Sequence, residues 1–326
     1  YNGNASALIV PDTLGGYPVK KIGNRAFYGN TKIQSVILPD SIDTIESDAF
    51  SGCTNLGSIQ LPNSLTALGC NAFRNCSSLT YIWLPKTLKS VNTPSSVYGV
   101  FPGCTALQKV ELEEGMTAIP SSLFSECPIS AITIPNTVTS IGSYAFAYSG
   151  LVSIEIPDSV TSIGSNAFYG CAKLTSVKIA DSVTEINGQA FDGCAKLNNV
   201  KMPNSLTSIG YYAFRNCSSL TYIWLPKTLK SVLGNNNAGV FPGCTALQTV
   251  ELEEGMTAIP VCLFQECPLS TITIPNTVTS IELLAFAKSE LVSIVIPDSV
   301  TEINRSAFDG CTKLSDVKMS NRLTVF

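Results

Sequence analysis

The chain has 326 residues, a formal net charge of −4, no histidine and only 13% charged residues. Its 45% hydrophobic content excludes a disordered chain, and its weakly acidic balance excludes the electrostatic footprint of a nucleic-acid-binding protein. The lack of histidine excludes a Ser-His-Asp triad and a Cys2His2 zinc site. No apolar run approaches the roughly 18 residues of a membrane-spanning helix, so we expect no membrane insertion in this segment.

A repeat of mostly 22 or 23 residues dominates the sequence. It is marked by a recurring Ala-Phe or similar step, which accounts for all but one of the 14 phenylalanines. These residues are Phe27, Phe50, Phe73, Phe101, Phe124, Phe146, Phe168, Phe191, Phe214, Phe241, Phe264, Phe286 and Phe308. Such a period predicts a solenoid, in which each repeat buries its apolar face against its neighbours.

Each repeat predicts three elements in chain order. The Ala-Phe segment is expected to form a short helical turn with its Phe in the core, followed by a strand of period two. In the strand that contains Trp83, we expect Ile82 and Leu84 to face inward and Tyr81 and Trp83 to face outward, and Pro85 to end the strand. A second short apolar step, such as Val160 to Ile163, predicts another strand.

Two segments carry a family resemblance, residues 163–179 (IGSNAFYGCAKLTSVKI) and 295–304 (VIPDSVTEIN). They resemble the BspA-like leucine-rich repeat family, and residues 10–27 resemble the lead-in to its first full repeat. The resemblance extends over essentially the whole chain. It implies a right-handed leucine-rich-repeat superhelix of short parallel strands and short helical turns, with about 13 repeats. It also implies an extracellular or cell-surface protein of adhesion type, so we expect the export signal and the anchor outside this segment.

A block of several repeats is itself duplicated in the sequence. Residues 74–91 recur letter for letter at 215–232, so a block of six repeats is present twice, at about 20–160 and 161–300. A third copy begins at residue 301. No linker or shift in composition separates the blocks, and we therefore expect a single solenoid over residues 1–326.

The cysteines follow the repeat as well. Ten of the 12 stand three residues after a repeat Phe, namely Cys53, Cys76, Cys104, Cys127, Cys171, Cys194, Cys217, Cys244, Cys267 and Cys311. Parallel stacking would place neighbouring Cβ atoms about 5 Å apart, beyond the ~3.8 Å of a disulfide. We therefore expect a buried ladder of structural thiols that donate to the backbone of the next turn and hold no metal. The pattern assigns no role to Cys70 and Cys262.

The only two tryptophans fall at outward strand positions, each with a Tyr beside it. We expect two equivalent ligand-binding patches, one in each block. Their residues are Tyr81, Trp83, Lys109 and Glu111 in the first and Tyr222, Trp224, Thr249 and Glu251 in the second. Longer repeats follow each Tyr-Trp strand, with extra residues around 92–98 and 233–238. The alternative is that duplication copied a stabilising aromatic ladder that binds nothing.

No catalytic constellation, phosphate loop or cofactor motif is visible. Two acidic runs could bind calcium, but a solvated acidic edge is favoured because no Asp-rich loop with a Gly turn accompanies them. They are Glu111, Glu113, Glu114, Glu251, Glu253 and Glu254. The sequence predicts a non-enzymatic surface protein that presents a sheet face to a host or cell-surface protein, a matrix component or a glycan. A passive spacer and a carbohydrate-binding module remain as alternatives.

Overall fold

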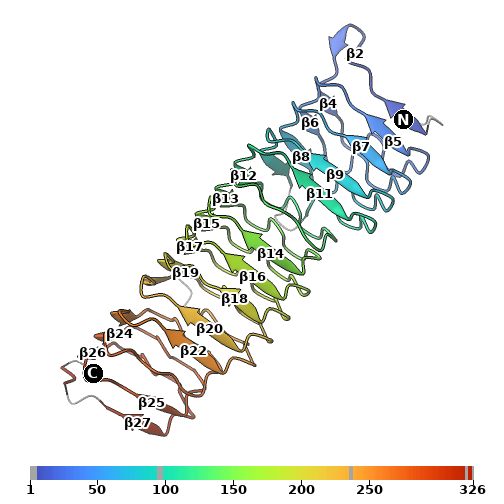
Figure 1. The fold of residues 1–326 in the computed structure, drawn as a ribbon. Coiled ribbons are helices and arrows are strands. Elements are labelled where there is room, and N and C mark those ends of the chain that lie inside the picture. Colours follow the sequence, from blue (N-terminus) through green and yellow to red (C-terminus); the bar gives the residue numbers. More distant parts are fainter. Residues whose placement is uncertain (1–5, 94–97, 235–237, 320–321, 325–326) are drawn as a thin grey trace. The chain divides into compact units, whose positions relative to one another are not determined.

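The computed structural model describes residues 6–93, 98–234, 238–319 and 322–324 (Figure 1). The chain forms two compact units, residues 1–159 and 160–326. Each unit is built from short parallel strands that return once per repeat in two columns, as the sequence predicts. The described part of the chain contains no helix long and apolar enough to cross a membrane.

In the first unit, the strand column that carries the Tyr-Trp pair consists of β1 (Ala7–Ile9), β5 (Ser35–Ile37), β7 (Ser58–Gln60), β9 (Tyr81–Leu84), β11 (Lys109–Leu112) and β14 (Ser153–Ile156). The second column consists of β4 (Lys21–Ile22), β6 (Thr44–Ile45), β8 (Ala67–Gly69), β10 (Ser90–Asn92), β12 (Ala118–Ile119) and β13 (Ser140–Ile141). An antiparallel hairpin, β2 (Thr13–Leu14) and β3 (Tyr17–Pro18), precedes β4.

In the second unit, the corresponding first column consists of β16 (Ser176–Ile179), β18 (Asn199–Lys201), β20 (Tyr222–Leu225), β22 (Thr249–Leu252), β25 (Ser293–Val295) and β27 (Asp316–Lys318). The second column consists of β15 (Ser162–Ile163), β17 (Glu185–Ile186), β19 (Ser208–Gly210), β21 (Ser231–Leu233), β23 (Ala258–Ile259), β24 (Ser280–Ile281) and β26 (Glu302–Ile303).

The first column places apolar and polar side chains on opposite faces. In β9, Ile82 and Leu84 are fully buried, whereas Tyr81 is exposed and Trp83 is half-buried. Because side chains alternate along a strand, one face of the strand fills the core and the other faces solvent. The strand ends before Pro85, which has no N–H to donate to a neighbour. These expectations are confirmed.

The expected helical turn at each Ala-Phe step is wrong, because in the described residues these segments are successive hydrogen-bonded turns. In most repeats, a residue with positive φ stands two positions before the Phe and another stands two positions after it. Asn71 and Asn75 flank Phe73 in this way, with φ of 56° at both. Left-handed residues at that spacing interrupt any run of helical backbone.

The same conformation turns backbone groups toward the next repeat. The N–H groups of Asp48, Phe50 and Gly52 donate to carbonyl oxygens of the following repeat at 3.0, 2.8 and 2.7 Å. A helix would direct these N–H groups into its own preceding turn. Because of the left-handed residues, these N–H groups form hydrogen bonds between repeats, whereas a helix would form them within one repeat.

The phenylalanines form a stack inside each unit. Neighbouring ring centroids lie 5.0 to 6.3 Å apart in the first unit, from Phe27 to Phe146. The spacing is 5.0 to 6.2 Å in the second unit, from Phe168 to Phe308. The rings are nearly parallel, and those away from the unit ends are fully buried. Aromatic stacking at this distance adds to the large apolar area that each ring buries.

The twelve cysteines are free thiols, and all but Cys311 are buried. Seven thiols of the repeat slot donate to the carbonyl of the Phe one repeat earlier, as Cys76 does to Phe50 at 3.2 Å and Cys217 to Phe191 at 3.3 Å. Burial raises the pKa of Cys53 to about 11 and that of Cys104 to about 12. These side chains are therefore neutral thiols at physiological pH.

The two cysteines outside the slot occupy defined positions in the loop. The thiol of Cys70 lies 3.4 Å from the hydroxyl of Ser47, which fills the same place one repeat earlier. Cys262 occupies the left-handed position two residues before Phe264, with φ of 58°. Both side chains are buried, so each contributes to packing.

Thiol chemistry tests the cysteine ladder. The reactive species is the thiolate, burial raises the pKa of thiols such as Cys127 and Cys267, and all the thiols but Cys311 are buried. Alkylation of the folded protein near pH 8 should therefore be slow, with Cys311 reacting first. After denaturation without reductant, all 12 cysteines should be titrated. A count well below that number would contradict the ladder, because it would show that disulfides had formed.

The left-handed positions can be tested at Lys288, which is exposed and has φ of 55°. Lys288→Gly should raise the free energy of unfolding by up to about 1 kcal/mol, because glycine adopts this conformation without strain. The β-branched control Lys288→Val should lower it by a similar amount. The comparison uses denaturant midpoints, and equal midpoints for the two variants would contradict the prediction.

Candidate functional site

The structure gathers each set of predicted site residues on one exposed face of its unit. In the first unit, β9 and β11 pair in parallel, with Tyr81 opposite Lys109 and Trp83 opposite Glu111. In the second unit, β20 and β22 repeat this register, with Tyr222 opposite Thr249 and Trp224 opposite Glu251. We call these two sets of four residues platform 1 and platform 2.

Platform 1 is held by a charged network. The Tyr81 hydroxyl donates to the Glu111 carboxylate at 3.1 Å, and the Lys109 ammonium lies 3.2 Å from the same carboxylate oxygen. Lys109 also lies over the Tyr81 ring, 5.5 Å from its centroid. The hydrogen bond and charge of Lys109 lower the pKa of Glu111. Partial desolvation and the bond to Glu111 raise the pKa of Tyr81.

Platform 2 lacks the lysine, because Thr249 stands in its place. The Tyr222 hydroxyl donates to Glu251 at 2.6 Å, and this bond to an ionised carboxylate raises the pKa of Tyr222 to about 12. In both platforms, therefore, the Tyr ring is fixed by a carboxylate on the next strand. The β-ladder fixes the backbone of the half-buried Trp beside it.

The remaining acidic residues of the two runs are placed differently. Glu113 accepts a bond from the Lys86 backbone N–H at 2.9 Å and pairs with the Lys86 ammonium at 3.1 Å. Glu253 is bonded to Lys227 in the same way. These contacts lower the pKa of both carboxyl groups. The described residues contain no cluster of three or more side chains that could hold a metal ion.

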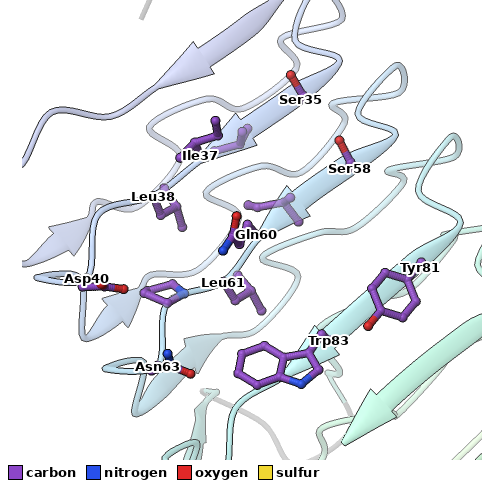
Figure 2. Close-up of a pocket in the computed structure, with 13 residues that line it drawn as sticks. Ser35, Ile37, Leu38, Asp40, Ser58, Gln60, Leu61, Asn63, Tyr81 and Trp83 are labelled. Atoms are coloured by element: carbon purple, nitrogen blue, oxygen red, sulfur yellow. The ribbon is translucent and has the colours of Figure 1, made fainter. Parts of the chain in front are cut away.

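A hollow of about 680 Å³ adjoins platform 1 on the side of the preceding strands. Figure 2 shows Ile37, Gln60 and Trp83 projecting from neighbouring strands of the same face. We call this depression hollow 1. The side chains that define it include Ile37, Asp40, Gln60, Asn63, Tyr81 and Trp83.

A second hollow, of about 400 Å³, adjoins platform 2 in the same position. We call it hollow 2. Its lining includes Asn198, Asn199, Lys201, Asn204, Tyr222 and Trp224. Another depression in the second unit, of about 510 Å³ beside Thr273 and Val295, has no aromatic side chain in its lining. Hollows 1 and 2 thus combine a recess with an ordered aromatic wall.

Sequence reasoning identified the aromatic walls but missed the recesses. It joined each Trp to the strand that follows, whereas the hollows lie on the side of the strand that precedes, at Gln60 and Lys201. These two residues occupy the same outward position as the Trp, one repeat earlier. The column of outward residues was therefore the signal in the sequence that could have indicated the recesses. Of the longer repeats, residues 94–97 and 235–237 lie outside the described residues.

The pKa of Tyr222 provides a test of platform 2. Replacing Glu251 by Gln removes the negative acceptor, so the pKa of Tyr222 should fall from about 12 toward its ordinary value of about 10. Since the folded-state pKa is raised, the bond stabilises the fold below about pH 10, and this contribution is lost as pH rises through about 12. Absorbance titration of tyrosinate in the wild type and Glu251→Gln should show that one tyrosine titrates at lower pH in the variant. Superimposable curves would contradict the assignment.

Comparisons with known proteins place this fold. The chain matches the BspA type leucine rich repeat region, in 6 copies, over residues 20–152, 139–236 and 234–326. A leucine rich cell surface protein from Faecalibacterium prausnitzii A2-165 is 30% identical, covering 98% of this chain and 88% of that chain, with a TM-score of 0.49. No curated protein matches the chain significantly.

Two further solved structures are more distant in sequence. A leucine-rich repeat protein from Eubacterium ventriosum is 23% identical over 88% of this chain and 83% of that chain, with a TM-score of 0.52. The pneumococcal vaccine antigen PcpA is 18% identical over 97% and 89%, with a TM-score of 0.51. Both likenesses concern the fold alone. Because the family pattern matches almost the whole chain and the structure repeats its strands accordingly, this chain belongs to the BspA-type leucine-rich repeat family.

Proposed function

We propose that this chain is a non-enzymatic, surface-displayed binding protein of adhesion type, and that its two platforms are the contact sites. The observation that carries the proposal is the duplicated Tyr-Trp wall, which is fixed by a carboxylate and open to a hollow in both units. Tyr and Trp supply large contact areas with few rotatable bonds, and they are enriched at the energetic centres of interfaces.

The display on a cell surface is supported by the family and by the similar Faecalibacterium protein, which is described as a cell surface protein. The partner is a host or cell-surface protein, a matrix component or a glycan. Two equivalent platforms on one chain favour a partner with repeated epitopes, because the second contact then forms at a high effective concentration.

Two alternatives differ in what the platforms do. As a passive spacer, the chain would display other parts of a longer protein, and the aromatic walls would only stabilise the strands. As a carbohydrate-binding module, it would use the same walls to hold a sugar. The buried core and the stacked phenylalanines fit all of these functions equally, so what the platforms bind, if anything, distinguishes them.

Binding by the whole chain tests the proposal. The purified protein is applied to arrays of matrix proteins, mucins and glycans beside the double variant Trp83→Ala, Trp224→Ala. Removing both indole rings should weaken any true platform ligand on the order of thirtyfold, as for a central interface residue.

A matched control is Tyr17→Ala, which removes an exposed aromatic ring from the β2–β3 hairpin, a hairpin that contributes no residue to either platform. This variant should bind as the wild type does. Equal binding by the wild type and the double variant would overturn the role of the platforms, and no binding to any array would favour the spacer.

A further inference from the structure

We propose that hollow 2 binds an acidic saccharide, that is, a sugar bearing a carboxylate or a sulfate, and that hollow 1 does not. This inference rests on the proposed function, because it assigns a ligand class to one of the two sites. It comes from the charges that duplication has left at equivalent places beside two nearly identical aromatic walls.

Hollow 2 carries a positive charge in its lining. Lys201 is exposed on β18 and lines the hollow beside Trp224. The structure describes no hydrogen bond or ion pair for its ammonium group. On β16, Lys178 stands in register with Lys201.

The negative groups around hollow 2 are occupied. The Glu251 carboxylate lies on the following strand and accepts the Tyr222 hydroxyl at 2.6 Å. Asp181 accepts bonds from the backbone N–H of Asn204 at 2.9 Å and from its side-chain amide at 3.1 Å. The charge of Lys201 also contributes to lowering the pKa of Asp181. Neither carboxylate belongs to the lining, where Lys201 is the charged group.

Hollow 1 has the opposite sign. Gln60 stands where Lys201 stands in hollow 2, and Ile37 replaces Lys178. The charged residue of its lining is Asp40, the counterpart of Asp181. The structure describes no hydrogen bond or ion pair for the Asp40 carboxylate. An anion in hollow 1 would therefore face a negative charge, whereas a neutral ligand would meet amide and hydroxyl partners.

The other lining groups of hollow 2 fit a sugar. Asn199 and Asn204 are exposed and provide both hydrogen-bond donors and acceptors, which match hydroxyl groups in either direction. The half-buried Trp224 indole offers an apolar wall for the face of a pyranose ring. The volume of about 400 Å³ lies within the roughly 300–1,000 Å³ of small-molecule sites.

The test uses the full chain and an array of saccharides bearing uronate, sialate or sulfate groups. Each is printed beside its neutral counterpart, prepared by methyl esterification or desulfation, so carboxylate and sulfate are distinguished. We expect wild-type binding to at least one acidic saccharide and weaker binding to its neutral form. Lys201→Gln should weaken the acidic interaction about fivefold, and Trp224→Ala on the order of tenfold.

Two matched variants of hollow 1 complete the design. Asp40→Asn should leave acidic binding through hollow 2 unchanged. Gln60→Lys together with Asp40→Asn should create a second site for acidic saccharides and raise the number of saccharide molecules bound per chain. Circular dichroism of each variant establishes that it is folded, so a loss of binding is not mistaken for unfolding.

The outcomes separate this inference from the proposed function. Binding only to proteins or neutral saccharides, lost in the Trp variants, would overturn the inference and leave the proposed function standing. Equal binding of an acidic saccharide by Lys201→Gln would overturn it as well, as would equal binding of a poly-glutamate peptide, which has charge without a sugar ring. No binding of any kind would overturn both.

Discussion

The structure depends on the backbone hydrogen bonds that join each repeat to the next. Parallel strands supply them on two sides, and the left-handed loops around each Phe supply them on a third, through N–H groups such as that of Phe50. Every other feature follows from this constraint. A ring recurs at one position of every repeat and a thiol at another position of ten repeats, so equivalent side chains are stacked. The outward side chains form columns in which a Trp can meet a neighbour's charge.

The strands, the inward phenylalanines and the outward Tyr-Trp pairs could be predicted from the sequence, because period two and the repeat both leave a direct signature. The loops could not. Asn71 is a residue that tolerates positive φ, but Tyr144 and Leu284 adopt the same conformation with no sequence preference for it. Tertiary hydrogen bonds impose the conformation there, and the helical expectation failed for that reason. The hollows were missed because a recess depends on side-chain volumes over several strands.

The two blocks show how a duplicated surface changes while its core is retained. The Tyr-Trp strand is identical in both, whereas the neighbouring positions differ in charge at Gln60 and Lys201. The two blocks also differ in charge in the loops around the repeat phenylalanines. Asp192, which is almost fully buried, is bonded to the Arg215 guanidinium at 2.9 Å, and its counterpart in the first unit is the uncharged Ser51. Exposed columns and loop edges therefore accept new charges when a local partner or solvent accommodates them.

The thiol arrangement has a consequence for how such a chain grows. Seven of the sulfurs donate backward to a carbonyl of the previous repeat, and none of the twelve forms a disulfide with a second cysteine. Insertion or loss of one repeat by recombination therefore leaves no cysteine without its mate. A repeat protein cross-linked by disulfides would have to gain or lose cysteines in pairs, because otherwise one cysteine would be left unpaired. This chain can therefore change its length one repeat at a time, because the cysteine of an inserted repeat can donate to the Phe carbonyl of the repeat before it.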